Sequence, residues 1–315
     1  MTKGLILLFL ACLLGVSSAI AADYTFSADC PKQYPSDSVS VHSSSAADMV
    51  LLVPGAGSRR KDLHLGHLKW GEYYGEVQKV LASMGIENHV LPSDINGNYS
   101  VEQRAKKVAR FVKRWGKKGK KVLLFGHSMG GLAVRVALRD YSIHKYLSAV
   151  ITVSTPHRGT PLVDFLLKKS TPLFVLRRFM ALLGYDETQK KYLKELSEEH
   201  SYTWNTYIDS DPKFPPVYTV LVGDGIFGLT KSFAVLSITG KIIKEMIRGK
   251  KYSDWEKRTD GLVPIYSQFW GACLAQIKSD HASIIGKTLS GSGMKKFKKV
   301  QWEIFTRVRR LGLLK

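Results

Sequence analysis

The sequence contains few cysteines, few acidic residues and no apolar run long enough to cross a membrane. Of its 315 residues 3 are cysteine, and Cys12 lies in a leading segment that we expect to be removed. Cys30 and Cys273 can therefore form one disulfide, and the sequence does not show whether they meet. The apolar stretch at residues 5–16 is shorter than the roughly 20 residues of a membrane-spanning helix.

Basic residues outnumber acidic ones by a wide margin. The chain carries 47 Lys and Arg against 26 Asp and Glu, a net charge of +21. This excess indicates an anionic partner, and a merely solvated basic surface is the alternative. Because no zinc finger or RNA-recognition signature is present, we expect no nucleic-acid partner. A polyanionic envelope and an anionic membrane surface remain as candidates, and the charge favours the membrane surface.

The first 21 residues have the three parts of a secretory signal. Lys3 supplies the positive start, residues 5–16 the apolar stretch, and residues 19–21 a small-residue cleavage site. We therefore expect an exported protein, periplasmic or secreted. Residues 22–46 are rich in Ser, Pro and Asp and predict an irregular lead-in, so the folded domain should span residues 47–315.

The stretch at residues 121–140 carries the most specific chemical pattern. An unbroken apolar run at residues 122–125 predicts a strand buried on both faces, and a helical pattern begins after Gly130. Between them stands the pentapeptide Gly126-His127-Ser128-Met129-Gly130. A G-x-S-x-G sequence between strand and helix is typical of a nucleophile elbow, in which the serine hydroxyl is exposed on a strained turn. The alternative is a glycine-rich turn with a solvated serine.

A second glycine-rich turn follows an earlier strand. Residues 49–53 predict that strand, and residues 54–58 the turn. A serine hydrolase needs a second backbone donor for the oxyanion at this place in the chain. We expect the N–H groups of Ala56 and Met129 to form the oxyanion hole, whereas an ordinary strand-exit turn is the alternative.

A serine nucleophile needs a histidine base and an acid that orients it. His281 is the histidine that lies beyond both acid candidates, so we assign it as the base. Asp224 lies just past a predicted strand and Asp260 lies 21 residues before His281; spacing alone does not separate them. Asp280 adjoins His281 and should not reach its ring.

Strands predicted at 49–53, 87–91, 122–125, 149–153 and 217–222 alternate with helical patterns. The alternation predicts an α/β fold with a mostly parallel central sheet and helices on both faces. Two apolar segments interrupt it: a helical cap or lid insertion at about 162–214 and a second insertion at about 226–258. The helix at 101–115 should bury one apolar face and expose a basic face that includes Arg104.

Four segments together resemble the bacterial secreted lipases of the true-lipase type, related to triacylglycerol lipases. They are residues 52–57, 126–131, 154–159 and 260–264, with His281 behind them. The resemblance implies an α/β-hydrolase fold, carboxylic-ester hydrolysis and a lipid substrate, and it favours Asp260 as the acid. It also implies a structural role for His157. Pro54 stands where the family's oxyanion motif usually has a histidine, which should leave a backbone donor unaffected.

These observations predict an exported serine ester hydrolase, a lipase, that works without a cofactor or metal. A phospholipase or a lipid acyltransferase with the same triad is the alternative. A non-catalytic protein that binds polyanions or membranes is a more remote one, and an intact triad argues against it.

Calcium should be dispensable. In the lipases that the chain resembles, a calcium ligand is an Asp two residues after the catalytic His, and here Ser283 occupies that place. The second calcium carboxylate lies about twenty residues before the catalytic acid, where residues 237–241 hold no acid. We expect a strong chelator to leave hydrolysis and melting temperature unchanged. A loss of either that calcium specifically restores would contradict this prediction.

Overall fold

The computed structural model describes residues 25–27, 29–30, 45–56, 64–65, 68–69, 73–92, 100–171, 173, 177, 190–205, 214–225, 231–287 and 291–315. The predicted secretory signal at residues 1–21 lies outside the described residues, and the lead-in at 22–46 is described in part.

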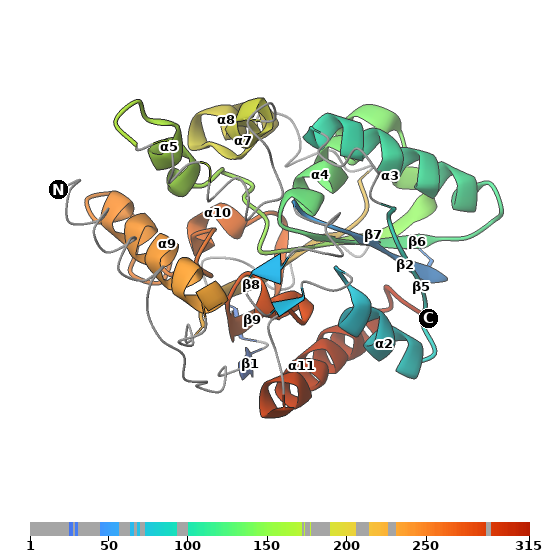
Figure 1. The fold of residues 1–315 in the computed structure, drawn as a ribbon. Helices are drawn as coiled ribbons and strands as arrows, with labels where there is room; N and C mark the ends of the chain where they lie inside the picture. The colour runs from blue at the N-terminus through green and yellow to red at the C-terminus, as the bar shows by residue number, and fades with distance from the viewer. Residues whose placement is uncertain are drawn as a thin grey trace.

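A seven-stranded sheet forms the centre of the molecule (Figure 1). Its strand order is β1-β9-β8-β7-β6-β2-β5, and every neighbouring pair is parallel except β1 with β9. The bounds are β1 Thr25–Ser27, β2 Met49–Val53, β5 Glu87–Val90, β6 Val122–His127, β7 Leu147–Val153, β8 Val217–Asp224 and β9 Ala272–Ser279. A separate pair, β3 His64–Leu65 and β4 Leu68–Lys69, is antiparallel. The predicted mostly parallel sheet is confirmed.

Helices cover both faces of this sheet, as the alternating pattern predicted. Helices α3 (Val101–Gly116) and α4 (Met129–Tyr141) lie on one face, and α2 (Gly75–Ser83) and α11 (Gly291–Arg310) on the other (Figure 1). Strands β2, β6 and β7 are buried on both faces because each face has its own apolar core. Helix α3 begins with a capping box between Ser100 and Gln103, an arrangement that stabilises a helix start by about 1 kcal/mol.

Both predicted insertions contain helices. Between β7 and β8 lie α5 (Pro161–Leu167), α7 (Lys190–Leu193), a short 3-10 turn at Lys194–Leu196 and α8 (Glu198–Asn205). The second insertion contains α9 (Lys231–Ile247), and α10 (Ile265–Gln268) follows it. Further 3-10 turns are His144–Tyr146 and Ser283–Ile285. No helix in the described ranges has the length and apolar character of a membrane span.

The carboxyl ends of the parallel strands place chemistry-bearing residues at one edge of the sheet. Ser128 follows β6, Asp224 ends β8, and His281 comes two residues after β9. Strands that run in the same direction finish at the same edge, so residues far apart in the sequence meet there. Helix α4 begins at this edge directly after Ser128.

A disulfide joins Cys30 to Cys273, with a Cα–Cα distance of 6.0 Å. It closes a loop of 243 residues and fastens the segment after β1 to β9. The antiparallel pairing of β1 with β9 lies beside it, with Ser27 opposite Gln276. The N-terminal segment is therefore held to this side of the sheet by both backbone pairing and a covalent bond.

Loss of this disulfide should lower stability without changing the fold. A bond that closes so long a loop is worth on the order of 2–5 kcal/mol. We expect Cys30→Ala to lower the melting temperature by roughly 5 °C or more. Thermal unfolding of the variant and of the unaltered protein, each with and without reductant, measures the effect. An unchanged melting temperature after verified reduction would contradict it.

Candidate active site

Ser128 stands on a strained turn between β6 and α4. Its φ of 55° and ψ of −132° place a non-glycine residue in a sparsely populated backbone region. Two backbone hydrogen bonds hold this conformation: Ser128 N donates to Val153 O at 3.0 Å, and Gly131 N donates to Ser128 O at 3.0 Å. The predicted strand, turn and helix are therefore present around the serine.

Glycine is required on both sides of this turn. A Cβ at Gly130 would lie 2.1 Å from the carbonyl oxygen of Val53, and a Cβ at Gly126 would lie 2.8 Å from the Cα of Gly131. Neither contact could be relieved without moving backbone, because the atoms that would be struck are main-chain atoms. The missing side chains allow the start of α4 to pack directly against the end of β2.

The structure brings Ser128, His281 and Asp260 together in one hydrogen-bonded series. His281 Nε2 lies 2.9 Å from Ser128 Oγ, and His281 Nδ1 lies 2.8 Å from Asp260 Oδ2. The backbone N–H of His281 also donates to the carbonyl oxygen of Asp260 at 2.9 Å. Asp260 is fully buried and His281 is 8% exposed, so little water competes for these bonds. This geometry allows His281 to take a proton from Ser128 while Asp260 orients its ring.

Backbone donors hold the Asp260 carboxylate in place. Its Oδ1 atom accepts hydrogen bonds from Leu262 N at 2.9 Å and Val263 N at 2.8 Å, which leaves Oδ2 for His281. A buried carboxylate with three donors is well compensated for its lost hydration. The backbone N–H groups of the turn after Asp260 thus fix the orientation of its carboxylate.

The other two aspartates considered from the sequence lie elsewhere. Asp224 forms an ion pair with Arg258, at 3.1 Å. The Asp280 carboxylate accepts hydrogen bonds from the N–H groups of Ala282 and Ser283, both at 2.9 Å. Burial raises the pKa of Asp280 above its usual range. Asp280 therefore shapes the turn that carries His281, and Asp260 is the carboxylate at the ring.

The turn after β2 passes against the nucleophile. A Cβ at Gly55 would lie 2.8 Å from the Cβ of Ser128, and Ala56 is the next residue. Met129 begins α4 on the other side of the serine and is buried. The two predicted oxyanion residues therefore flank Ser128, one from each neighbouring segment.

Two side chains to which the sequence assigned no role in the site, Arg104 and Tyr73, support this turn. Arg104 Nη1 donates to the carbonyl oxygen of Pro54 at 3.1 Å, and Arg104 is buried. The expectation that it belongs to the solvated basic face of α3 is wrong, because the turn after β2 covers that part of the helix. The hydroxyl of Tyr73 lies beside Gly55, where a Cβ would approach it to 2.6 Å.

His127 and His157 are buried neighbours of the site. His127 Nδ1 lies 2.8 Å from the Tyr73 hydroxyl, and its ring centroid lies 4.7 Å from that of His281. Burial and the nearby His281 lower the pKa of His127 well below its usual value, which favours the neutral ring. His157 lies 3.2 Å from Thr152 Oγ1, and burial lowers its pKa too. A neutral His127 can pack against His281 without opposing the charge that His281 would gain.

Within the part of the chain that the structure describes, no three His, Cys, Asp or Glu side chains are grouped as a metal ion would require. Calcium independence stays a prediction for the chelator experiment.

The fold is that of an α/β-hydrolase. The mature form of Bacillus licheniformis lipase BlEst2 has a similar structure, with a TM-score of 0.60 and 17% identity, over 93% of this chain and 98% of that one. Staphylococcus hyicus lipase is similar with a TM-score of 0.53 and 16% identity, over 83% and 94% of the two chains.

Sequence comparison places the chain next to lipases of this superfamily. Residues 96–171 match the PGAP1-like alpha/beta domain. Over 225 residues the chain is 27% identical to triacylglycerol lipase 2 of Saccharomyces cerevisiae, covering 68% of this chain. The chain spans 62% of the yeast protein's length. The resemblance to lipases of the α/β-hydrolase superfamily that the motifs predicted is confirmed.

Asp260→Asn should reduce turnover far more than Asp224→Asn. An amide at position 260 cannot stabilise the charged ring of His281, and the equivalent change in a serine protease lowers kcat about 10⁴-fold. Asp224 touches Arg258 on a part-exposed surface, so its amide variant should stay within about tenfold of the unaltered enzyme. Steady-state kinetics on a soluble ester measures both. The reverse order of effects would identify Asp224 as the acid.

Proposed function

We propose that the protein is a serine ester hydrolase, a lipase that cleaves acyl-glycerol esters through an acyl-enzyme. The observation that carries this proposal is the unbroken hydrogen-bonded series from Ser128 Oγ through His281 to Asp260, on a strained elbow at the start of a helix. A structural serine needs neither the strained turn nor a buried histidine and carboxylate aligned behind it.

In the first half of the reaction, Ser128 Oγ attacks the ester carbonyl carbon and His281 Nε2 accepts the hydroxyl proton. The C–O bond to the alcohol then breaks, and His281 returns its proton to the departing alcohol. Asp260 orients the imidazole and stabilises its charged form. In the second half, a water molecule attacks the acyl-enzyme with His281 as base, and the fatty acid leaves.

The tetrahedral intermediates carry a negative oxygen that needs donors already in place. We assign this role to the N–H groups of Ala56 and Met129, which flank Ser128. The N-terminus of α4 behind Ser128 adds a favourable dipole for the developing charge. Each such donor contributes about 10²–10³ in turnover in related chemistry.

The lipid substrate follows from similarity rather than from a bound molecule. The matching yeast protein is named a triacylglycerol lipase, which supports an acyl-glycerol substrate. A phospholipase or an acyltransferase would use the same three residues, because only the acyl acceptor or the head group differs. The leading segment supports export, with periplasmic or secreted action.

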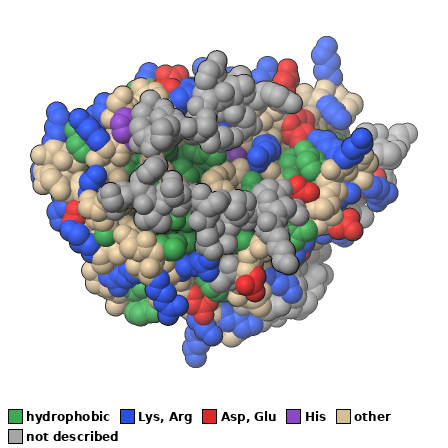
Figure 2. All heavy atoms as spheres, turned by 180° about the vertical axis from the view of Figure 1, so that it is seen from behind, with side chains coloured by type: hydrophobic (Ala, Val, Ile, Leu, Met, Phe, Trp, Pro, Cys, Tyr) green, Lys and Arg blue, Asp and Glu red, His purple; other side chains and the backbone are tan. Residues whose placement is uncertain are grey.

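The positive charge supports work at an anionic membrane surface. On the face seen in Figure 2, Lys and Arg side chains spread around the periphery with Asp and Glu among them, and hydrophobic side chains lie near the middle. Spread charge attracts a bilayer as a whole, and its effect should weaken with salt.

Ser128→Ala should abolish ester hydrolysis and leave the fold intact. Loss of the nucleophile typically costs on the order of a millionfold in turnover. The unaltered enzyme and the variant are tested on triglycerides, on neutral and anionic phospholipid vesicles, and on short nitrophenyl esters, with and without an alcohol acceptor. Free fatty acid from triglyceride supports the lipase. Activity on short esters alone would indicate an esterase rather than a lipase. Acyl transfer to the alcohol would indicate an acyltransferase.

Retention of more than a small fraction of activity by Ser128→Ala would rule out Ser128 as the nucleophile. Circular dichroism of the variant, compared with the unaltered protein, shows that any loss of activity is chemical rather than structural.

A further inference from the structure

We propose that Asp224 is a positioning residue for the acid. Through Arg258 it holds the loop that carries Asp260 against β8 and β9, and so maintains the distance between Asp260 and His281. This inference rests on the proposed function, because it assigns a role within the same site.

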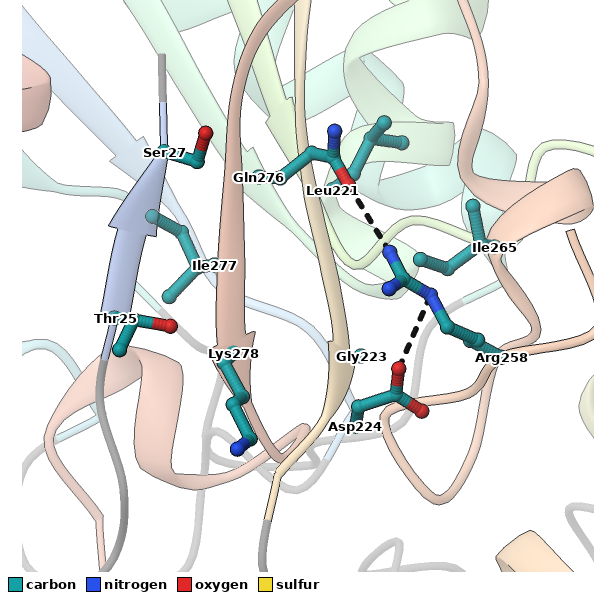
Figure 3. Close-up of a pocket in the computed structure, with 10 residues that line it drawn as sticks. All are labelled: Thr25, Ser27, Leu221, Gly223, Asp224, Arg258, Ile265, Gln276, Ile277 and Lys278. Atoms are coloured by element: carbon teal, nitrogen blue, oxygen red, sulfur yellow. Dashed lines mark hydrogen bonds and ion pairs between the residues drawn. The ribbon is translucent and has the colours of Figure 1, made fainter. Parts of the chain in front are cut away.

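The first support is an ion pair that crosses from a strand to the acid loop. Asp224 Oδ2, at the end of β8, lies 3.1 Å from Arg258 Nε. Arg258 Nη2 donates to Gln276 Oε1 of β9 at 3.0 Å. Figure 3 shows the guanidinium between these two partners. Because Arg258 comes two residues before Asp260, one side chain fastens the start of the acid loop to two adjacent strands.

Main-chain contacts at residues 224–225 reinforce this link. Asp224 N donates to the carbonyl oxygen of Thr259, the residue directly before Asp260, at 3.2 Å. Asp224 has a φ of 54°, a left-handed conformation that aspartate tolerates better than most residues. The backbone therefore turns sharply at the point where β8 meets the acid loop.

The same two residues touch the segment that carries the base. A Cβ at Gly225 would lie 2.4 Å from the carbonyl carbon of Ser279 and 2.6 Å from the N of Asp280. His281 follows immediately. Residues 224–225 thus contact the acid loop on one side and the base segment on the other, and we call them the 224–225 junction. A shift of Asp224 would therefore change the position of the acid loop relative to the segment that carries His281.

Trp255 completes the attachment of the loop. Its Nε1 donates to Gln276 Oε1 at 2.9 Å, so that this one oxygen accepts from both Trp255 and Arg258. The guanidinium carbon of Arg258 lies 5.4 Å from the centre of the Trp255 ring. These contacts hold the guanidinium within ion-pair distance of the Asp224 carboxylate, although the Arg258 Nε–H is not aligned for a hydrogen bond to it.

The ion pair between Arg258 and Asp224 is partly exposed to water, which weakens it. The side chains of Arg258 and Asp224 are 35% and 34% exposed, and they line a cavity of about 440 Å³ together with Lys278 of β9 (Figure 3). Water in this cavity screens the pair, so its removal should loosen the acid loop rather than unfold it. We expect Asp224→Asn to lower kcat about threefold to fivefold, the size of effect that a screened ion pair has.

The experiment compares Asp224→Asn with a matched control. Asp140→Asn removes the partner of Arg139 in an ion pair of similar exposure, 28% and 33%, at the far end of α4. For each variant we would measure kcat, KM and the pH profile on a soluble nitrophenyl ester, well below the melting temperature. Asp224→Glu keeps the carboxylate and should recover part of the loss. Arg258→Gln should match Asp224→Asn, and the double variant should be no worse than either.

The expected signature is a lower kcat with unchanged KM. The pH profile should also differ from that of the control variant, because a less firmly held Asp260 orients the ring of His281 less well. A stabilising role alone would lower the melting temperature and leave both quantities unchanged. If Asp224→Asn and Asp140→Asn have the same kcat and pH profile, the inference is overturned.

Three further results separate this inference from the function on which it rests. If Asp224→Asn is as inactive as Asp260→Asn, Asp224 is no mere positioning residue and the inference fails. If Ser128→Ala remains active, the proposed function fails, whatever Asp224 does. If Ser128→Ala and Asp260→Asn are inactive while Asp224→Asn equals the control, the positioning role of Asp224 is refuted. The proposed function is then unaffected.

Discussion

The close approach of α4 to the end of β2 is the constraint on which the site depends. Val53 O lies where a side chain at residue 130 would be, so the helix can start this close to the sheet only with glycine there. That contact places Ser128 on its strained turn and brings the turn with Gly55 and Ala56 against it. A larger residue at position 130 would push the start of α4 away from Val53 and Pro54.

The supports of the site act mostly through the main chain. Arg104 binds the carbonyl oxygen of Pro54, Asp280 binds two N–H groups in the turn after His281, and the Asp260 carboxylate accepts two N–H groups of its own loop. Loops that are held in this way keep their geometry although neighbouring side chains differ.

Local patterns in the sequence predicted the parts of the fold that local physics determines. The strand at 49–53, the elbow around Ser128 and the basic helix after Ser100 follow from apolar runs, glycine spacing and helical periodicity. Strand β9 escaped prediction because Ala272–Ser279 interrupts its apolar residues with Gln276 and Lys278, which remain only partly buried beside β8. Arg104 was placed on the wrong face because periodicity does not show which segment will cover a helix.

The choice between the two acids needed three-dimensional information. Asp224 follows a predicted strand and Asp260 lies 21 residues before His281, so spacing did not separate them, and only the resemblance to lipases favoured one. In the structure the difference is the partner: a guanidinium for Asp224 and an imidazole for Asp260. The disulfide also needed three-dimensional information. Its cysteines are 243 residues apart in the sequence, and such a spacing does not show whether they meet in space.

The order of the chain has a consequence for biosynthesis. Ser128 and His281 are 153 residues apart, and the strand that leads to His281 pairs with β1, from the beginning of the domain. During synthesis from the N-terminus, the serine and its elbow exist long before their base does. Contacts of such large sequence separation form slowly because a long loop must close first. Under the proposed function, the nascent chain holds an inert serine, and ester cleavage can begin only after β9 has joined the sheet between β8 and β1.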